Sequence, residues 1–318
     1  MKKKLFNIVK LIVIYIIIII SLFETAYRFD WIDFYSSEIK ALNNLQEDNK
    51  SSKQKLLIFG DSFSADQNSY IKYLRDSLPQ YSIINSAVPG TSMFHHKRFL
   101  KRRINTFKPS TVIFQLYVGN DLIDYNHPVN WSENSFSRNV YWSISDYLIS
   151  LQYLNYKLGQ ITTTDITTHD AKVDHEFSIE TYNAREKLYY KADSNVLVNS
   201  INGTHKAMKD LTFDLNNVIK QLSKETQVYI LIIPHVAQTS NKKRNQIESL
   251  GATLDENTHS LSYGFLNQVK KELIRGTIIS PLDLFQKNSN FYYPNDPHLN
   301  PDGQKALANY ILKTIHLN

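Results

Sequence analysis

The sequence contains no cysteine among its 318 residues. This absence excludes disulfide bonds, thiol nucleophiles and cysteine-ligated metal sites. The chain also lacks the Gly-x-x-x-x-Gly-Lys and Gly-x-Gly-x-x-Gly patterns that cradle nucleotide phosphates, and the Gly-x-Ser-x-Gly turn of one large class of α/β enzymes. Its histidines have no carboxylates at metal-ligand spacing. We therefore expect neither a metal ion nor any other cofactor.

The composition is that of an ordinary globular chain, with 42% hydrophobic and 21% charged residues. The formal net charge is +6, and part of this excess lies in Lys2–Lys4 and in the stretch 95–103. A basic cluster can bind nucleic acid or form the solvated face of a helix. Because no nucleic-acid-binding motif accompanies it, we interpret the stretch as a helix face and expect no nucleic-acid partner.

Residues 5–23 are almost wholly apolar, with Lys10 as the only charge. This length fits one membrane-spanning helix, which needs about 20 residues. The lysines that precede it favour a cytoplasmic N-terminus and export of the rest of the chain. A cleaved signal peptide is the alternative. Its cleavage site needs two small residues separated by one residue, but in the pair that ends at Ala26 the first position is Glu24. We predict an uncleaved anchor at residues 1–26 of a bacterial-type cytoplasmic membrane, with the remainder in the periplasm or otherwise outside the cytoplasm.

Residues 27–54 are predicted to form a juxtamembrane stalk that begins with aromatic residues suited to the membrane interface and becomes polar at 43–53. From Lys55 onward, segments typical of strands and helices alternate. The expected strands are 55–60, 81–88, 110–118, 227–234 and 276–281. The expected helices lie near 67–78, 93–107, 204–224, 257–274 and 302–315. This alternation predicts a parallel sheet with right-handed crossovers, and hence a three-layer α/β/α domain over 55–318.

One long stretch, at about 124–200, interrupts this alternation. It is rich in Tyr, Trp, Asn and Ser and has little strand pattern. An insertion at the carboxyl edge of a sheet can act as a lid or a substrate-binding loop, or it can simply stabilise the domain by packing on its side. Both interpretations remain open from the residues alone.

Candidate catalytic residues follow the first three expected strands. Ser62 lies in the Gly-Asp-Ser turn after the first strand, and Gly90 and Asn120 follow the second and third. The carboxyl ends of parallel strands meet at one edge of a sheet, where such folds bind ligands. A serine attack on an ester needs donors for the oxyanion, and the N–H groups of Ser62 and Gly90 with the Asn120 amide would supply them.

A base for the serine is available near the C-terminus, in the loop before the last helix. His298 follows Asp296 by two residues, so a tight turn could let this carboxylate hold the imidazole Nδ1–H. The imidazole Nε2 would then be free to accept the proton of Ser62. A Gly-Asp-Ser tripeptide can also be a plain turn, and a histidine in a proline-rich loop a surface residue, so from the residues alone a Ser62–His298–Asp296 triad is one of two open interpretations.

The four segments together resemble the SGNH (GDSL-type) hydrolase superfamily. Gly60-Asp61-Ser62-Phe63 is similar to the family's nucleophile block, Gly90 to its glycine block, Gly119-Asn120-Asp121 to its asparagine block and Asp296-Pro297-His298 to its last block. The last block is usually Asp-x-x-His, but the position three before His298 is Asn295. The Asp-x-His spacing resembles the SGNH-like domains of bacterial exopolysaccharide O-acetyltransferases. We therefore assign Asp296 as the residue that orients His298, with Asn295 as the fallback.

A second departure concerns the asparagine block, which in the family is usually Gly-x-Asn-Asp. Here the glycine immediately precedes Asn120, so its turn can differ. Asp121 is expected to cap this turn rather than to act in catalysis.

The resemblance implies a flavodoxin-like SGNH fold with a five-stranded parallel sheet. It also implies a serine esterase, a hydrolase of acyl esters. With the predicted anchor, the expected enzyme is membrane-bound and acts on esters of an envelope glycan or related substrate, with acetyl as the expected acyl group. Two alternatives remain open. Resolution of the same acyl-enzyme on a sugar hydroxyl would make the protein an O-acetyltransferase of a cell-envelope polysaccharide, and retention of the fold without catalysis would make it a glycan-binding or assembly protein.

Overall fold

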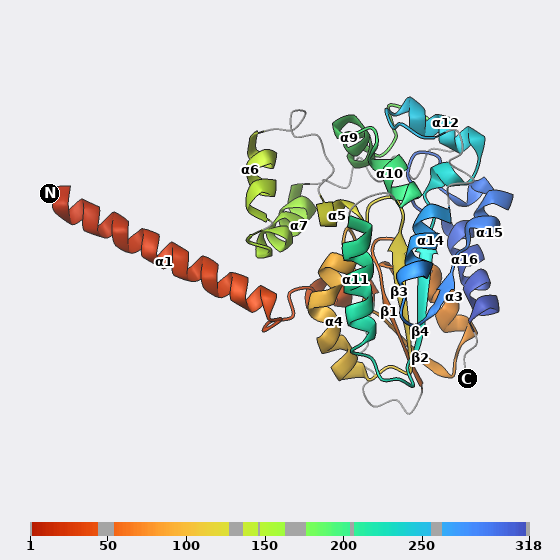
Figure 1. Ribbon diagram of the computed structural model, residues 1–318, viewed down its shortest axis with the longest axis horizontal. Helices are drawn as coiled ribbons and strands as arrows, with labels where there is room; N and C mark the ends of the chain where they lie inside the picture. The colour runs from red at the N-terminus through yellow and green to blue at the C-terminus, as the bar shows by residue number, and fades with distance from the viewer. Residues whose placement is uncertain are drawn as a thin grey trace. The chain divides into compact units, whose positions relative to one another are not determined.

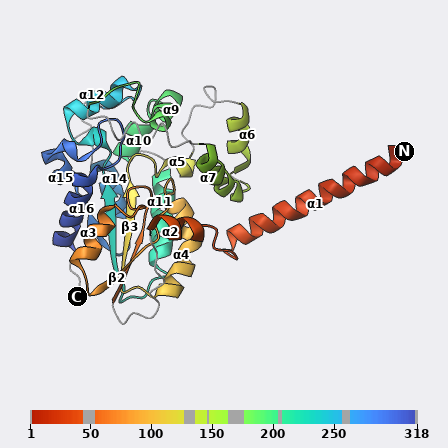
Figure 2. The ribbon, with the colours of Figure 1, turned by 180° about the vertical axis from the view of Figure 1, so that it is seen from behind.

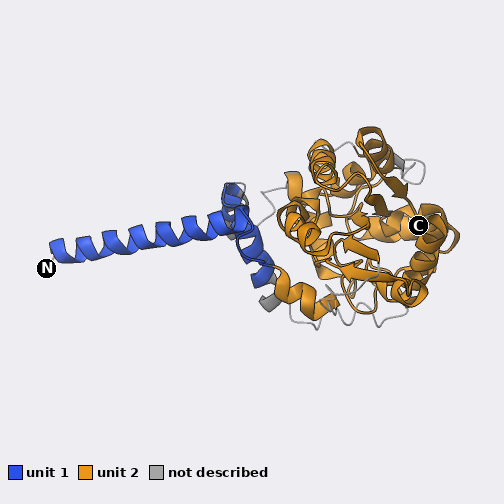
Figure 3. Ribbon diagram, turned by 90° about the horizontal axis from the view of Figure 1, so that it is seen from below, with its two compact units in different colours: residues 1–34, 135–163 blue, residues 35–134, 164–318 orange. Residues whose placement is uncertain are grey.

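The computed structural model describes residues 2–43, 54–126, 136–145, 147–162, 176–203, 207–255 and 263–315 (Figure 1). The chain forms two compact units, one of residues 1–34 and 135–163 and the other of residues 35–134 and 164–318 (Figure 3). This division differs from the predicted anchor, stalk and domain, because part of the 124–200 stretch folds with the N-terminal helix. The polar end of the predicted stalk, at 44–53, lies outside the described residues.

The larger unit is built on a five-stranded parallel sheet of order β2-β1-β3-β4-β5. Its strands are β1 (Gln54–Phe59), β2 (Tyr81–Asn85), β3 (Thr111–Tyr117), β4 (Gln227–Ile233) and β5 (Thr277–Ile279). This 2-1-3-4-5 order is that of flavodoxin-like doubly wound folds. The predicted fold class is therefore confirmed.

The strands consist mainly of apolar residues, as expected of a parallel sheet with helices on both faces. Leu56 to Phe59 of β1 have no exposed surface, and every residue of β3 is buried. Helices α4 (Met93–Phe107) and α11 (Ala207–Ile219) pack together on one face, and α3 (Tyr70–Ser77) and α16 (Pro301–Thr314) on the other (Figures 1 and 2). The described remainder of this unit includes α2 (Ser36–Asn43), α5 (Ile123–Asn126), α9 (Ala184–Ala192), α10 (Val196–Asn202), α12 (Asn241–Ser249), α14 (Tyr263–Glu272) and α15 (Leu282–Lys287).

The basic stretch at 95–103 lies on α4, and its interpretation as a solvated helix face is wrong for three of its seven basic residues. His95, His96 and Arg103 are buried, and Lys97 Nζ bonds to Asp214 Oδ2 at 2.5 Å. Burial lowers the pKa of His96 to about 3, so its imidazole is neutral at physiological pH. The buried residues of this stretch thus take part in the packing of α4.

The smaller unit contains α1 (Lys2–Arg28), α6 (Phe136–Ser145) and α7 (Ser150–Thr162). Among the described helices, α1 has the length and apolar composition needed to cross a membrane, properties that a membrane anchor and a signal sequence share. The buried Glu24 carboxylate on α1 accepts the N–H groups of Ile149 at 3.1 Å and Ser150 at 2.9 Å. Arg28 pairs with Glu24 and donates to the carbonyl oxygen of Tyr147 at 2.6 Å. These bonds satisfy N–H groups at the start of α7, which a helix cannot satisfy internally.

The aromatic residues after the apolar run have two environments. Tyr27 is buried in the smaller unit, where its ring packs near those of Phe34 and Tyr153, whereas Phe29 and Trp31 are exposed. Tyr35 is buried in the larger unit. Only the exposed pair fits the predicted role at a membrane interface.

Gly60, at the end of β1, provides a test of how tightly this edge of the sheet is packed. A Cβ at this position would lie 2.3 Å from Gln115 Oε1 and 2.7 Å from Ser64 Oγ. We expect Gly60→Ala to lower the free energy of unfolding by about 1–3 kcal/mol, as measured by denaturant unfolding of the detergent-solubilised protein. Gly251→Ala gives a comparison in which a Cβ meets nothing within 4 Å and only the positive φ of +109° is strained. A loss below about 0.5 kcal/mol in Gly60→Ala would show that crowding at Gly60 is unimportant.

Candidate active site

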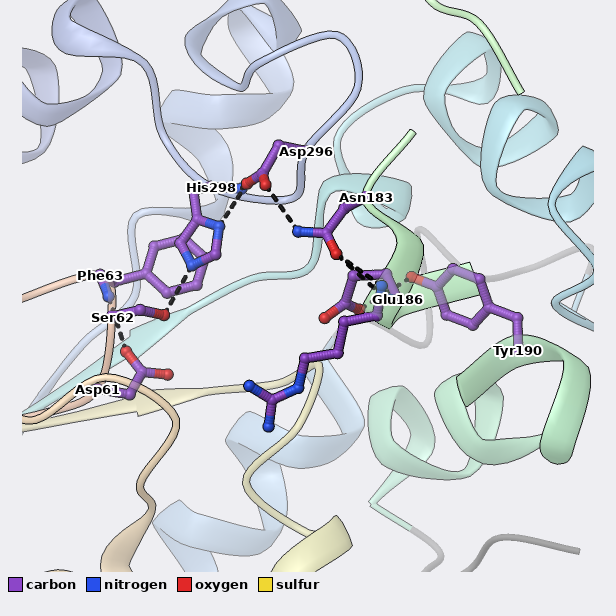
Figure 4. Close-up of polar contacts among 9 residues, drawn as sticks. Asp61, Ser62, Phe63, Asn183, Glu186, Tyr190, Asp296 and His298 are labelled. Carbon is purple, nitrogen blue, oxygen red and sulfur yellow. Dashed lines mark hydrogen bonds and ion pairs between the residues drawn. The ribbon is translucent and has the colours of Figure 1, made fainter. Parts of the chain in front are cut away.

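Ser62 and His298 meet at the carboxyl edge of the sheet, although 236 residues separate them. Ser62 follows β1, and His298 lies in the loop before α16. The Ser62 Oγ lies 2.6 Å from His298 Nε2 (Figure 4). The imidazole packs against the ring of Phe63, with 4.8 Å between ring centroids. A hydroxyl at this distance from an imidazole nitrogen has the geometry of a nucleophile and its base.

The turn that carries Ser62 is fixed by its own backbone and by β3. Asp61 Oδ1 accepts the N–H of Phe63 at 2.9 Å, and the Asp61 N–H donates to Gln115 Oε1 at 3.0 Å. The same Gln115 oxygen accepts the hydroxyl of Ser64 at 2.9 Å. Gln115 is part of an apolar strand and nothing in the sequence singled it out, yet it sets the position of the turn.

Asp296 faces the other nitrogen of the imidazole. Its Oδ1 accepts the Nδ1–H of His298 and also the backbone N–H of His298, the latter at 2.9 Å. The second bond closes a tight turn over the two-residue spacing, which is how the short Asp-x-His pattern reaches the imidazole. The structure therefore brings together the three residues of the predicted triad.

Asn183 holds the second oxygen of Asp296. Its Nδ2 donates to Asp296 Oδ2 at 2.8 Å (Figure 4), while its Oδ1 caps α9 by accepting the N–H groups of Arg185 at 3.0 Å and Glu186 at 3.3 Å. Because the cap fixes the amide oxygen, the amide nitrogen must face Asp296. Asn183 comes from the 124–200 stretch, so this segment takes part in building the site.

The electrostatics of Asp296 follow from these contacts. Burial of this 1%-exposed carboxyl alone would raise its pKa, but the charge of His298 and the hydrogen bonds from His298 and Asn183 outweigh burial and lower the pKa to about 2. Asp296 is thus ionised over the physiological range. Asp61 shows the opposite balance, since burial raises its pKa to about 6 despite the Phe63 N–H and the His298 charge.

Asn295, the fallback for orienting His298, is occupied elsewhere. Its Oδ1 accepts the N–H of Ser178 at 2.7 Å and its Nδ2 donates to the carbonyl oxygen of Glu176 at 2.8 Å. Its own carbonyl oxygen accepts the Asn183 N–H at 2.9 Å. Asn295 therefore ties the segment that carries Asn183 to the loop that carries His298.

Gly90 and Asn120 lie in the turns after β2 and β3, at the same edge of the sheet as Ser62. Gly90 has a φ of +67°, a conformation that glycine adopts without strain. In the part of the chain that the structure describes, the buried Asn120 Oδ1 has no hydrogen-bond partner. The Asp121 carboxylate accepts the Tyr117 N–H at 3.0 Å, which confirms its predicted role in closing this turn.

A second histidine, His235, follows β4 and is linked to the site through α9. Its Nδ1 accepts the Ala237 N–H at 3.1 Å, so the neutral imidazole carries its proton on Nε2 and donates to Tyr190 Oη at 3.1 Å. Tyr190 in turn lies 3.5 Å from the Glu186 carboxylate (Figure 4). Burial lowers the pKa of His235 to about 3, which makes it unsuited to accept a proton near neutral pH.

The role of Asn183 can be separated from its role as a helix cap. Asn183→Ser keeps a capping oxygen but removes the donor to Asp296, which should raise the pKa of the Asp296 carboxyl. A more basic Asp296 stabilises the protonated form of His298, the expected base. We therefore expect the acid limb of a pH profile of kcat/KM for ester cleavage to move to higher pH, with roughly a tenfold loss of kcat/KM on that limb. Asn183→Asp should move the acid limb to still higher pH, because this substitution places a second carboxylate against Asp296.

The unfolding midpoint is the control for these two variants. Both variants keep a capping oxygen, so we expect the midpoint to stay unchanged. An unchanged acid limb in both would mean that the bond from Asn183 to Asp296 does not tune the triad.

The sequence matches no known family model and no curated protein. Solved structures do match. The chain is similar to the acetyl xylan esterase AlAXEase, with 12% identity, 82% of this chain and 100% of that chain covered, and a TM-score of 0.43. It is similar to TesA with 14% identity over 82% of this chain and 97% of that chain, with a TM-score of 0.42. It is also similar to a lipase/acylhydrolase from Enterococcus faecalis, with 12% identity over 82% of this chain and 94% of that chain and a TM-score of 0.42. At these identities and TM-scores, the function has to be inferred from the site itself.

Proposed function

We propose that this protein is a membrane-anchored, extracytoplasmic serine esterase of the SGNH type that acts on acyl esters of an envelope glycan. The observation that carries the proposal is the Ser62 Oγ at 2.6 Å from His298 Nε2, with the buried Asp296 behind the imidazole. The four sequence blocks in SGNH order support the same reading.

In the first half of the reaction, Ser62 Oγ attacks the acyl carbonyl carbon and its proton passes to His298 Nε2. Asp296 stays ionised and stabilises the imidazolium that forms. When the tetrahedral intermediate collapses, the alcohol leaves with the proton from His298 and the acyl group remains on Ser62. Water then attacks this acyl-enzyme by the same steps and releases the acid.

The oxyanion of each tetrahedral intermediate needs hydrogen-bond donors. We assign this task to the N–H groups of Ser62 and Gly90 and to the amide of Asn120. The assignment is supported by the place of all three in turns at the carboxyl edge of the sheet, the edge that also holds Ser62 Oγ. Removing one such donor typically costs 10²- to 10³-fold in kcat.

The proposal predicts that Ser62→Ala and His298→Ala each lower kcat for p-nitrophenyl acetate by roughly 10⁴-fold or more. Ser249→Ala, which removes an exposed serine on α12, is the control and should leave turnover unchanged. The assay should include a panel of oligosaccharide acceptors, because transfer uses the same acyl-enzyme as hydrolysis. Acetyl found on an acceptor would identify an O-acetyltransferase. Equal background rates in all proteins would indicate either a very selective acyl donor or a binding protein that only keeps the fold, and a fluorophosphonate adduct on Ser62 would exclude the second.

The anchor is proposed to remain uncleaved, and the smaller unit supports this. Removal of the apolar run by cleavage near Ala26 would remove Glu24, and the N–H groups of Ile149 and Ser150 would lose their acceptor. A segment that is built into a folded unit in this way is unlike a signal peptide that is discarded.

The topology can be tested with single cysteines, because the natural chain has none. Lys224 is exposed on the larger unit and Lys4 precedes the apolar run. We expect a membrane-impermeant maleimide to label Lys224→Cys in spheroplasts and Lys4→Cys only after lysis, with Met1 or Lys2 at the N-terminus of the purified protein. Labelling in the reverse order, or an N-terminus near residue 27, would contradict the proposed anchor.

A further inference from the structure

The side chain of Arg185 lies beside the proposed oxyanion site. Arg185 follows Asn183 by two residues at the start of α9, so the hydrogen bond from Asn183 to Asp296 fixes its backbone close to the triad. A Cβ placed on Gly90 would lie 3.6 Å from Arg185 Nη1 and 3.8 Å from Nη2. The guanidinium therefore reaches from α9 to the turn of Gly90.

The end of this guanidinium is available to a ligand. Its Nε donates to Tyr189 Oη at 3.3 Å, which directs the side chain along α9. In the described parts of the chain, Nη1 and Nη2 have no hydrogen-bond acceptor, and no carboxylate lies within 4 Å of them. Arg185 as a whole residue is exposed, so its side chain can be approached from solvent.

The charges around Arg185 limit which anion it can hold. Asp124 and Glu186 lie within electrostatic range of the guanidinium, and burial raises the pKa of both carboxyls, that of Asp124 to about 6. These acids would repel a dianion such as a phosphate monoester more strongly than a monoanion. The planar guanidinium fork also matches the two oxygens of a carboxylate.

We propose that Arg185 binds a carboxylate of the substrate, and that the preferred substrate is therefore an acyl ester of an acidic sugar. The inference rests on the proposed esterase function. With the scissile carbonyl oxygen at the Gly90 N–H, the guanidinium lies beside the ester, where a carboxylate on the same sugar ring can reach it. Arg185 thus selects among esters, whereas Ser62, His298 and Asp296 carry out the cleavage of all of them.

The test compares two substrates that differ in one group, mono-O-acetyl galacturonic acid and mono-O-acetyl galactose. We expect the wild-type protein to show a higher kcat/KM for the acidic sugar, and rising NaCl to reduce this preference. Arg185→Gln should lower kcat/KM for the acidic ester by roughly 10- to 100-fold and change that for the neutral ester less than about twofold. Arg185→Lys should restore part of the preference, because it keeps the charge without the fork.

Lys191→Gln is the control, since it removes an exposed positive charge from the same helix. Equal losses on both esters in Arg185→Gln, or no acidic preference in the wild-type protein, would overturn the proposal. Turnover of p-nitrophenyl acetate but of neither sugar would overturn it as well. Failure of the proposed esterase function can be told apart from failure of the Arg185 proposal. In that case the wild-type protein would cleave no ester, and its Ser62 would not react with a fluorophosphonate.

Discussion

The buried carboxylate of Asp296 is the group on which the architecture of the site depends. An ionised carboxylate away from water is costly unless hydrogen bonds satisfy both of its oxygens. Here Oδ1 accepts two N–H groups of His298 and Oδ2 accepts the amide of Asn183. The triad is therefore complete only when the segment before α9 has folded onto the C-terminal loop, a step that the contacts of Asn295 reinforce.

The structure divides the 124–200 stretch into parts with different tasks. Residues 135–163 belong to the smaller unit, where Glu24 binds the start of α7. Residues 176–203 belong to the larger unit, where α9 and its cap contribute Asn183, Arg185 and Glu186 beside the triad. Of the two interpretations that the sequence left open, a substrate-binding role suits the second part and a structural role suits the first.

The fold could be predicted because buried parallel strands leave a strong sequence signal, as the apolar run before Ser62 shows. Residues 110–118 and 93–107 likewise matched β3 and α4 closely. The three triad residues could be found because each lies in a short block of characteristic residues. Asn183 and Gln115 could not be found, because their importance comes from long-range contacts of an asparagine in an irregular segment and of a polar residue inside a strand. The buried His95 and His96 were misjudged for a related reason, since charge in a sequence does not report burial.

The central claim is that Ser62 is a nucleophile activated by His298, and covalent trapping tests it most directly. A fluorophosphonate probe reacts with an activated serine whatever acyl group or acceptor the enzyme uses. The account predicts that mass spectrometry of the labelled full-length protein finds the adduct on Ser62, and that His298→Ala abolishes labelling while the protein stays folded. Labelling of another serine, or of Ser62 at an equal rate without His298, would contradict it.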